Sequence, residues 1–324
     1  MKQARIWRCD RCGFQMIERH CKVICPNCGA RWDCSDVTIW VGDSQSELVA
    51  RACQPSDHAR LSSRWPAAPT PEEFREDALG AWLLLRGAQP LGYTTLFPVP
   101  GLPHVFELHG EVEASAYHDG GARLLLDTLL KDLDPDRVRQ LSYAVDSLQD
   151  EDARFLRDYG FRLEHEEWRM RCDLPPRQAV PALPRGYRLD LLHRQQSIDA
   201  FLRLYEESFS ATPWHQPYSR HEVASELQGN HSLLFLLYED GPVGFAWLRE
   251  HATEGEIEPI GLAPAHQRRG LGRALLLAAL WHLAERGLAR ARVGVWRQNE
   301  AAIHLYQDTG FRRASRRFFL AFDL

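Results

Sequence analysis

The chain has 324 residues and a formal net charge of −5. At about 150 residues per domain, this length predicts about two domains, and the net charge gives no global attraction to nucleic acid. The longest apolar run, Ala274–Trp281, is far too short to cross a bilayer, and Met1–Trp7 is polar and charged, without a signal-peptide core. We therefore expect a cytoplasmic protein that does not engage a membrane.

Two C-x-x-C motifs dominate residues 1–35. Cys9 and Cys12 form the first pair, Cys25 and Cys28 the second, and a glycine follows each pair. Such motifs place thiolates on tight turns, where four sulfurs can converge tetrahedrally on one metal ion. The segment resembles a zinc ribbon or a rubredoxin-like knuckle; zinc is the simplest assignment and iron the alternative. Three further candidate ligands lie nearby: His20, Cys21 and Cys34.

Basic side chains outnumber acidic ones in this segment. Basic ribbons can bind nucleic acid, whereas most small structural ribbons fold a terminus or dock a protein partner. We expect the structural role and keep nucleic-acid binding as the alternative. The basic residues are Lys2, Arg5, Arg8, Arg11, Arg19, Lys22 and Arg31.

Strand composition and proline-rich segments divide the rest of the chain. Asp36–Val41 has strand composition and follows the ribbon almost without a linker. Arg64–Pro71 is a proline-rich loop, and Leu174–Pro181 is a second proline-rich segment that we interpret as a linker. These features predict domains at residues 1–35, 36–174 and 184–324.

The elements after this linker begin with a strand, a helix and a hairpin. Gly186–Leu191 has strand character, Ser197–Phe209 has helical spacing, and Leu233–Glu250 predicts a hairpin that turns at residues 240–242.

A glycine-opened turn comes next, between the strand-like Glu256–Leu262 and the helical run Arg273–Leu280. The first turn of a helix exposes unpaired N–H groups and the positive end of its dipole. Gly270 and Gly272 have no Cβ and can adopt positive φ, so an anion can approach the backbone. The segment predicts a site for a phosphorylated ligand, with an ordinary solvated helix start as the alternative. Positive charge is added by Arg268, Arg269 and Arg273.

A second pattern lies downstream. Ala291–Trp296 alternates like a strand, and the next residues have helical spacing between an N-cap candidate, Asn299, and a stop at Gly310. Together with the turn, these residues resemble two signatures of the GNAT acyltransferase superfamily, Q/R-x-x-G-x-G/A and N-x-x-A-x-x-x-Y-x-x-x-G-F. The resemblance covers roughly residues 184–324 and implies an α/β fold with a mixed (α+β) sheet.

The resemblance also implies how acetyl-CoA is held. Backbone groups of Ile260, Gly261 and Leu262 would pair with pantetheine and polarise the thioester carbonyl. The cosubstrate would also contact Asn299. The pyrophosphate would be held by Gln267, Arg268, Arg269, Gly270, Leu271, Gly272 and Arg273.

Acyl transfer further requires an acid and a base. Tyr306, on the helix that follows Asn299, matches the family's general acid toward the thiolate; its alternative is a core aromatic side chain. Glu258 is the candidate base, and an ordinary carboxylate paired with arginine is its alternative. Some N-terminal amine acetyltransferases of this superfamily carry a glutamate where this chain has Gly294, so their base does not carry over.

The first half repeats the second at a constant offset. Gly160 precedes Gly310 and Gly120 precedes Gly270 by 310 − 160 = 270 − 120 = 150 residues. The chain therefore resembles a tandem GNAT repeat after the ribbon. At the equivalent positions the first copy has Tyr117, His118, Asp119, Gln149 and Leu156, and a carboxylate at residue 119 would repel pyrophosphate. We interpret the first copy as degenerate, with a structural or substrate-shaping role.

The sequence thus predicts an acetyl-CoA-dependent N-acetyltransferase whose centre lies in residues 184–324. Direct attack by a primary amine would move the acetyl group, and the acceptor would be a small molecule or a protein amine. The alternative is a non-catalytic acyl-CoA sensor or adaptor whose ribbon binds nucleic acid or a protein. Retention of Gln267, Gly270, Gly272, Asn299 and Tyr306 in one copy favours the enzyme.

Overall fold

The computed structural model describes residues 7–8, 15–19, 22–28, 31–33, 47–66, 68, 78–192, 194–213, 215–227, 231–239 and 241–324. These residues fall into two compact units. The first takes its residues from Met1–Phe74, Gly80–Thr94 and Gly110–Asp132; the second from Arg75–Leu79, Thr95–His109 and Leu133–Leu324. Within the described part, no helix has the length and apolarity needed to span a membrane.

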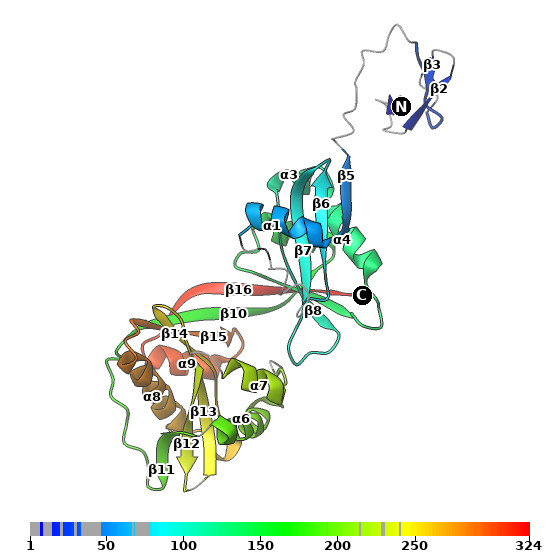
Figure 1. Cartoon of the computed structure of the whole chain (residues 1–324). Helices are drawn as coiled ribbons and strands as arrows, with labels where there is room; N and C mark the ends of the chain where they lie inside the picture. Colours follow the sequence, from blue (N-terminus) through cyan, green and yellow to red (C-terminus); the bar gives the residue numbers. More distant parts are fainter. Residues whose placement is uncertain are drawn as a thin grey trace. The chain divides into compact units, whose positions relative to one another are not determined.

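The N-terminal strands form a small antiparallel sheet, drawn in dark blue in Figure 1. Its order is β1 (Trp7–Arg8), β2 (Gln15–Arg19), β3 (Lys22–Ile24) and β4 (Arg31–Asp33). Cys25 directly follows β3 and is buried, whereas Cys28, in the same turn, is exposed. The predicted ligands Cys9 and Cys12 and the predicted strand Asp36–Val41 lie outside the described residues.

The rest of the first unit packs short helices against strands. Its core joins Leu61 and Trp65 to Leu83, Leu85 and Tyr93. The elements that contribute to this unit, wholly or in part, are β5 (Leu48–Ala52), η1 (Pro55–Asp57), α1 (His58–Arg64), β6 (Gly80–Arg86), β7 (Gln89–Pro98), β8 (Val105–Val112), α3 (Ala114–His118) and α4 (Gly121–Asp132).

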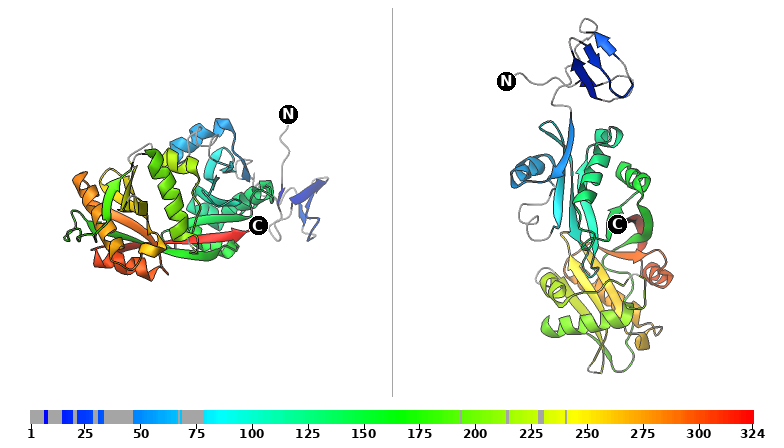
Figure 2. Two further views of the ribbon diagram at one scale, coloured as in Figure 1. Left: turned by 90° about the horizontal axis from the view of Figure 1, so that it is seen from below. Right: turned by 90° about the vertical axis from the view of Figure 1, so that its right-hand side faces the viewer.

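The second unit is built on a mixed sheet whose strands run in the order β11-β12-β13-β14-β15-β10-β16-β9. Figure 2 gives two further views of the chain, in which the last strand, β16, is drawn in red. Its elements are β9 (Gln140–Val145), α5 (Glu151–Tyr159), β10 (Arg162–Asp173), β11 (Tyr187–Leu191), α6 (Arg194–Phe209), α7 (Arg220–Glu226), β12 (His231–Tyr238), β13 (Gly241–Glu250), β14 (Glu254–Leu262), η2 (Pro264–His266), α8 (Leu271–Glu285), β15 (Arg290–Trp296), α9 (Glu300–Asp308) and β16 (Arg312–Asp323).

Strand alternation gives this sheet two apolar faces. In β12, Leu234 and Leu236 pack in the cluster that contains α8 and α9. Leu233 and Phe235 pack in a second cluster, with α6 and α7. Because successive strand side chains point to opposite faces, helices cover both sides of the same strands. Figure 1 shows α8 and the α6–α7 pair on the two sides of β12 and β13.

The centre of the sheet exchanges strands between the two halves of the sequence. β10, from the first half, pairs with β15, and β16, from the second half, pairs with β9. β10 and β16 lie beside each other between these partners and pair antiparallel. The parallel pair β8–β9 of the first half is therefore extended by β16, the last strand of the second half. The parallel pair β14–β15 of the second half is extended by β10, the last strand of the first half.

The exchange follows the 150-residue offset closely. β10 and β16 start and end 150 residues apart, since 312 − 162 = 323 − 173 = 150. Arg169 pairs with Gly294, and Phe319 pairs with Ala144. The second pair occupies the positions equivalent to the first, since 169 + 150 = 319 and 294 − 150 = 144. In the β10–β16 ladder, Glu167 pairs with Arg317, and this pair maps onto itself.

A stack of rings joins the exchanged strands. His165 on β10 lies between Trp296 and Phe319, with ring centroids 4.1 and 4.2 Å away and interplanar angles of 9° and 13°. Burial lowers the pKa of His165 from 6.5 to about 4, because a charged imidazolium loses its hydration there. The folded protein therefore holds His165 neutral.

This low pKa predicts a pH-dependent loss of stability. As the pH falls below 6.5 the unfolded chain takes up the proton before the folded chain does, so stability declines between pH 6.5 and about 4. Between about pH 7.5 and about pH 5, the contribution of His165 is a loss of about 2 kcal/mol. His165→Phe should remove this component of the urea-unfolding free energy, followed by tryptophan fluorescence. His304→Gln, at an exposed histidine, should leave it in place; an unchanged pH dependence in His165→Phe would contradict the assignment.

Candidate functional site

A bulge in β14 opens the sheet at the predicted site. Ala246 pairs with Ile260 and Leu248 pairs with Ile257, so β13 advances by 248 − 246 = 2 residues where β14 advances by 260 − 257 = 3. A bulge bends its strand and interrupts the ladder. β14 pairs with the parallel strand β15 only from Glu254 to Glu256. Beyond Glu256 the two strands form no further backbone pair, so the β15-facing edge of residues 258–262 has no strand partner.

The turn after β14 has the geometry that its glycine predicts. Gly270 is the N-cap of α8 with φ 76°, and a Cβ placed on it would have no atom within 4 Å. Only this glycine adopts the left-handed conformation in the turn, because Gly272 lies in the first turn of α8. Gln267 Nε2 donates to the Leu262 carbonyl at 2.9 Å. The start of α8 is therefore accessible to an anion.

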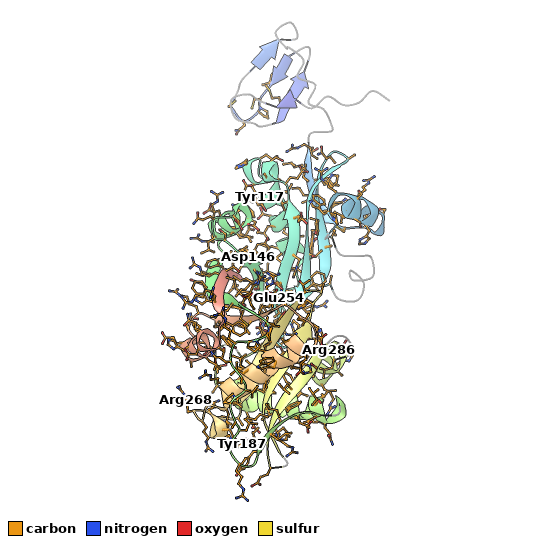
Figure 3. The ribbon with its side chains drawn as sticks, turned by 90° about the vertical axis from the view of Figure 1, so that its left-hand side faces the viewer. Tyr117, Asp146, Tyr187, Glu254, Arg268 and Arg286 are labelled. Atoms are coloured by element: carbon orange, nitrogen blue, oxygen red, sulfur yellow. The ribbon has the colours of Figure 1, made fainter. Side chains whose placement is uncertain are left out.

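Arginines surround this helix start in different ways. Arg268, labelled in Figure 3, and Arg269 are exposed, and Arg268 has a positive φ of 58°. Arg273 Nη2 donates to Gln178 Oε1 at 2.5 Å, and Gln178 Nε2 donates to the Asp308 carbonyl at 2.8 Å. The proline-rich segment is thus tied to both α8 and α9 beside the turn.

Asn299 and Tyr306 occupy the helix that the sequence predicts. The Asn299 side chain caps α9 by accepting from Ala302 N at 3.2 Å. Tyr306 is buried in the core and packs against Phe311, 5.6 Å away between ring centroids. Burial and the nearby Glu258 carboxylate raise the pKa of Tyr306 above its ordinary value. The phenol therefore stays protonated at neutral pH, as a general acid requires.

The Glu258 carboxylate lies against Gly294. Gly294 N donates to Glu258 Oε2 at 3.1 Å, and a Cβ on residue 294 would come within 2.7 Å of the same oxygen. β14 thus supplies a carboxylate to the space beside residue 294 from the neighbouring strand. Burial, then the Glu256 charge, raises the pKa of Glu258. Because the Glu258 charge contributes to the raised pKa of Tyr306, these two side chains lie close enough to interact electrostatically.

Glu256, on the same strand, is held differently. Arg292 donates to Glu256 Oε2 through Nε at 3.1 Å and through Nη2 at 2.6 Å, and Arg249 Nη1 lies 3.5 Å from Glu256 Oε1. Although burial opposes ionisation, these arginines hold the pKa of Glu256 below its ordinary value. A carboxylate with a lowered pKa is a poor proton acceptor at neutral pH, so Glu258 is better suited than Glu256 to act as a base.

A cavity of about 940 Å³ lies within the second unit and reaches Glu256, Glu258 and Gly294. One wall is the sheet, from β13 to β8. The cavity is also lined by residues within 99–102 and within the segment between α6 and α7, where Gln216 Nε2 donates to the Pro100 carbonyl. Its charged lining has both signs: Glu107, Glu164, Glu167, Glu256 and Glu258 face Arg169, Arg171, Arg249, Arg292 and Arg317.

Much of this cavity comes from the first half of the sequence. The cavity that reaches Glu258 is also lined by β10 residues and by Val99, Pro100, Leu102, Val105, Glu107, Gln140 and Ser142. The sequence analysis did not single out Glu167 or any other β10 side chain, because nothing local in β10 indicates that it pairs with β15. The only available signal was the 150-residue offset, which relates β10 to β16.

The equivalent turn of the first half holds an internal anion. Asp119 Oδ1 accepts from Gly121 N at 3.0 Å at the start of α4, and Asp119 also forms an ion pair with Arg86. Gly120 has φ 85°, like Gly270. The backbone donor that would face a phosphate in this turn is therefore bound to a protein carboxylate.

Two segments of the chain match known protein families. Residues 198–311 match the acetyltransferase (GNAT) family, and residues 7–39 match a zinc finger protein-like family. Residues 198–311 are thus similar to the GNAT acetyltransferases, in the region where the two signatures predict this resemblance. The N-terminal match agrees with the predicted ribbon.

The chain is also similar to individual mycothiol acetyltransferases. Mycothiol acetyltransferase of Thermobispora bispora is 33% identical over 172 residues, 50% of this chain and 58% of the relative. That of Pseudarthrobacter chlorophenolicus is 28% identical over 306 residues, 87% and 88% of the two chains. The chain spans 58%, 55% and 54% of three such relatives, from T. bispora, Nocardia farcinica and Actinosynnema mirum.

Solved structures show the same fold. A tandem GNAT protein from the clavulanic acid biosynthesis pathway has a TM-score of 0.61 at 16% identity, covering 86% of this chain and 98% of that one. A GCN5-related N-acetyltransferase from Sphaerobacter thermophilus has a TM-score of 0.60 at 18% identity, covering 87% and 96%. The predicted α/β fold class with a mixed sheet is confirmed.

The contact between Glu258 and Gly294 can be tested directly. In Gly294→Ala the new Cβ would displace the Glu258 carboxylate, and misplacing a reacting group by about 1 Å can cost about a hundredfold in rate. We expect kcat for acetyl transfer to fall by about that factor while acetyl-CoA binding is retained. Gly241→Ala is the control, since the nearest atom to its Cβ is 3.9 Å away. Normal turnover by Gly294→Ala would contradict this role for the Glu258 position.

Proposed function

We propose that the chain is an acetyl-CoA-dependent N-acetyltransferase whose centre lies in residues 184–324. One observation carries this proposal: β14 bulges beside Glu258, separates from β15 after Glu256, and leads into a glycine-opened helix start at Gly270. An open strand edge can pair with an extended amide-containing ligand, and the helix start can bind its phosphates. Together these features suit the pantetheine and pyrophosphate of one cosubstrate.

The predicted cosubstrate contacts are part of this proposal. The backbone of Ile260, Gly261 and Leu262 lies on the open edge, beyond the last β14–β15 pair. The helix start and its arginines, residues 267–273, would bind the pyrophosphate. Asn299 positions α9, and with it Tyr306, through its helix cap. Acetyl-CoA would supply the activated acetyl group at this edge.

Two side chains would handle the protons of the reaction. Glu258 would accept a proton from the amine, directly or through water, because its raised pKa makes it a stronger base than a surface carboxylate. Tyr306 would protonate the departing thiolate. The amine nitrogen would attack the thioester carbonyl directly, forming the C–N bond as the C–S bond breaks.

The cavity supports a small polar amine as acceptor. Carboxylates can receive a cationic amine, and arginines can contact hydroxyl or acidic groups elsewhere on the same molecule. The names of the relatives, mycothiol acetyltransferases, point to a small metabolite. We propose an acceptor of that general class.

We further propose that residues 36–174 and 184–324 are tandem copies and that only the second binds acetyl-CoA. The offset-related strand registers support the repeat. Asp119 supports the second part, because a phosphate at Gly121 would have to displace it against like charge. The first copy would instead supply β10 and the 99–107 segment to the acceptor cavity.

The enzyme and the acyl-CoA sensor can be distinguished by turnover. CoA release from acetyl-CoA is measured against a panel of amines, with acetyl-CoA binding measured in parallel. Tyr306→Phe should lower kcat about tenfold to a hundredfold with unchanged acetyl-CoA affinity, and Tyr238→Phe, at an exposed tyrosine, should resemble the parent chain. Binding without turnover of any amine would favour the sensor, and absence of binding would refute both.

We propose a structural zinc ion in the ribbon, held by Cys9, Cys12, Cys25 and Cys28. The zinc finger protein-like match over residues 7–39 and the buried Cys25 on a turn support it. The structure describes only Cys25 and Cys28 of this set, and its described residues contain no group of three or more metal-binding side chains.

Metal analysis tests the ribbon. The purified chain should contain about one zinc ion, and Cys25→Ser should lose it, because three thiolates bind zinc less tightly than four. Cys53→Ser, at a thiol outside the ribbon, should keep the metal. Iron in place of zinc would correct the assignment, and a metal-free parent chain would refute the site.

A further inference from the structure

Glu167 is the β10 side chain nearest the centre of the exchanged strands. It pairs in register with Trp296 on β15 and with Arg317 on β16. It lines the same cavity as Glu258, whereas the next residue back along β10, Glu166, does not line it. Because strand side chains alternate, Glu166 and Glu167 point to opposite faces. β10 therefore delivers one carboxylate from the first half of the chain to the predicted acceptor site.

The other carboxylates of the cavity are already engaged. Glu256 is bound by Arg292, Glu107 lies 3.2 Å from His109 Nε2, and Glu164 lies 3.5 Å from Arg162 Nη1. Glu258 accepts from Gly294 N. Within the described part of the chain, the Glu167 carboxylate forms no hydrogen bond and no ion pair. It is the cavity carboxylate with the most capacity to accept a donor from a ligand.

The surroundings of Glu167 favour reversible protonation near neutrality. Burial, and then the Glu258 charge, raise its pKa from 4.5 to about 7, against the opposing effect of two arginines. When two carboxylates interact, one of them retains a proton more strongly. The charges that act on Glu167 are those of Glu258 on β14, Arg317 on β16 and Arg169 on β10. Further charged or titratable groups of the same cavity are Glu256 on β14, Arg249 on β13, Arg292 on β15 and His215 between α6 and α7.

We propose that Glu167 is a second acid–base residue of the acceptor site, which binds the acceptor ammonium beside Glu258 and takes up its proton. This inference rests on the proposed acetyltransferase function. It places one proton-accepting group of the reaction in the first half of the chain, although the cosubstrate elements lie in the second. The degenerate copy then contributes chemistry as well as shape.

The proton balance follows from this role. The ammonium N–H bond breaks, the proton goes to a Glu167 carboxylate oxygen, and the electron pair stays on nitrogen. The neutral amine attacks the thioester carbonyl, and the C–S bond breaks with its electron pair on sulfur. Tyr306 gives its proton to the thiolate, Glu258 takes the proton lost by the acylated nitrogen, and this proton then restores the Tyr306 phenol. Glu167 then releases its proton to solvent, so that one proton is released overall.

The test measures kcat and KM against pH for the amine that the parent chain turns over fastest. A base with a pKa of about 7 must be deprotonated to act, so the parent kcat/KM should rise through that pH. Glu167→Gln should lose this limb and lower kcat/KM at pH 7 about a hundredfold. Glu167→Asp keeps a carboxylate and should restore part of the rate and the limb.

Two controls separate chemistry from structure. Glu166→Gln removes a carboxylate from the opposite face of β10, where it pairs with Arg297 and Arg316, and should retain the limb. Acetyl-CoA binding by each variant reports that the second unit is folded. If Glu167→Gln folds poorly, Glu167→Asp provides the comparison.

The two proposals fail in different ways. Full activity of Glu167→Gln with an unchanged pH profile, or equal losses in Glu166→Gln and Glu167→Gln, would overturn the role of Glu167 and leave the proposed function intact. A parent chain that transfers acetyl to no amine would overturn the proposed function, and the role of Glu167 with it.

Discussion

The antiparallel pairing of β10 with β16 determines the architecture of the second unit. These two strands come from opposite halves of the sequence. β10, from the first half, lies between β15 and β16 of the second half, and β16 lies between β10 and β9 of the first half. β15 depends on β10 for one of its neighbours, and β15 in turn forms the far side of the opening beside β14. The unpaired edge of β14, the cavity and the ring stack around His165 all follow from this pairing.

The carboxylates of the cavity differ in pKa because some are paired with arginine and others are not. Glu256 and Glu258 lie two residues apart on one strand, but Arg292 keeps the first ionised and Gly294 offers the second only a backbone N–H. The two helix starts differ in a similar way. Asp119 fills the donor position at Gly121, whereas the space around Gly270 is open. Small local differences thus give equivalent positions of one fold different electrostatic environments.

Local patterns predicted the elements of the second half well. The glycine-opened turn, the Asn299 cap and the hairpin before β14 appear close to their expected positions, because capping and turn chemistry depend on neighbouring residues. In the first half, α3 begins at Ala114, and no capping or turn pattern in the sequence predicted this helix start. Part of the first half and of the ribbon lies outside the described residues.

The strand exchange and Glu167 could not be read from local pattern. Pairing between β10 and β15 joins residues more than a hundred positions apart, and the alternation of either strand is equally compatible with other partners. Glu258 was found because a family signature lies beside it. Glu167 has no such signature, and its environment exists only after four strands have assembled.

The self-mapping pair of Glu167 and Arg317 bears on how such a protein could arise. Two identical chains associated about the same axis would present the same residue on both sides of this pair, glutamate against glutamate or arginine against arginine, and like charges directly opposite destabilise a sheet. A single covalent chain is free of that constraint, because each position can be substituted independently. Fusion of two copies therefore permits a charge asymmetry at the axis that a symmetric dimer of identical chains cannot have.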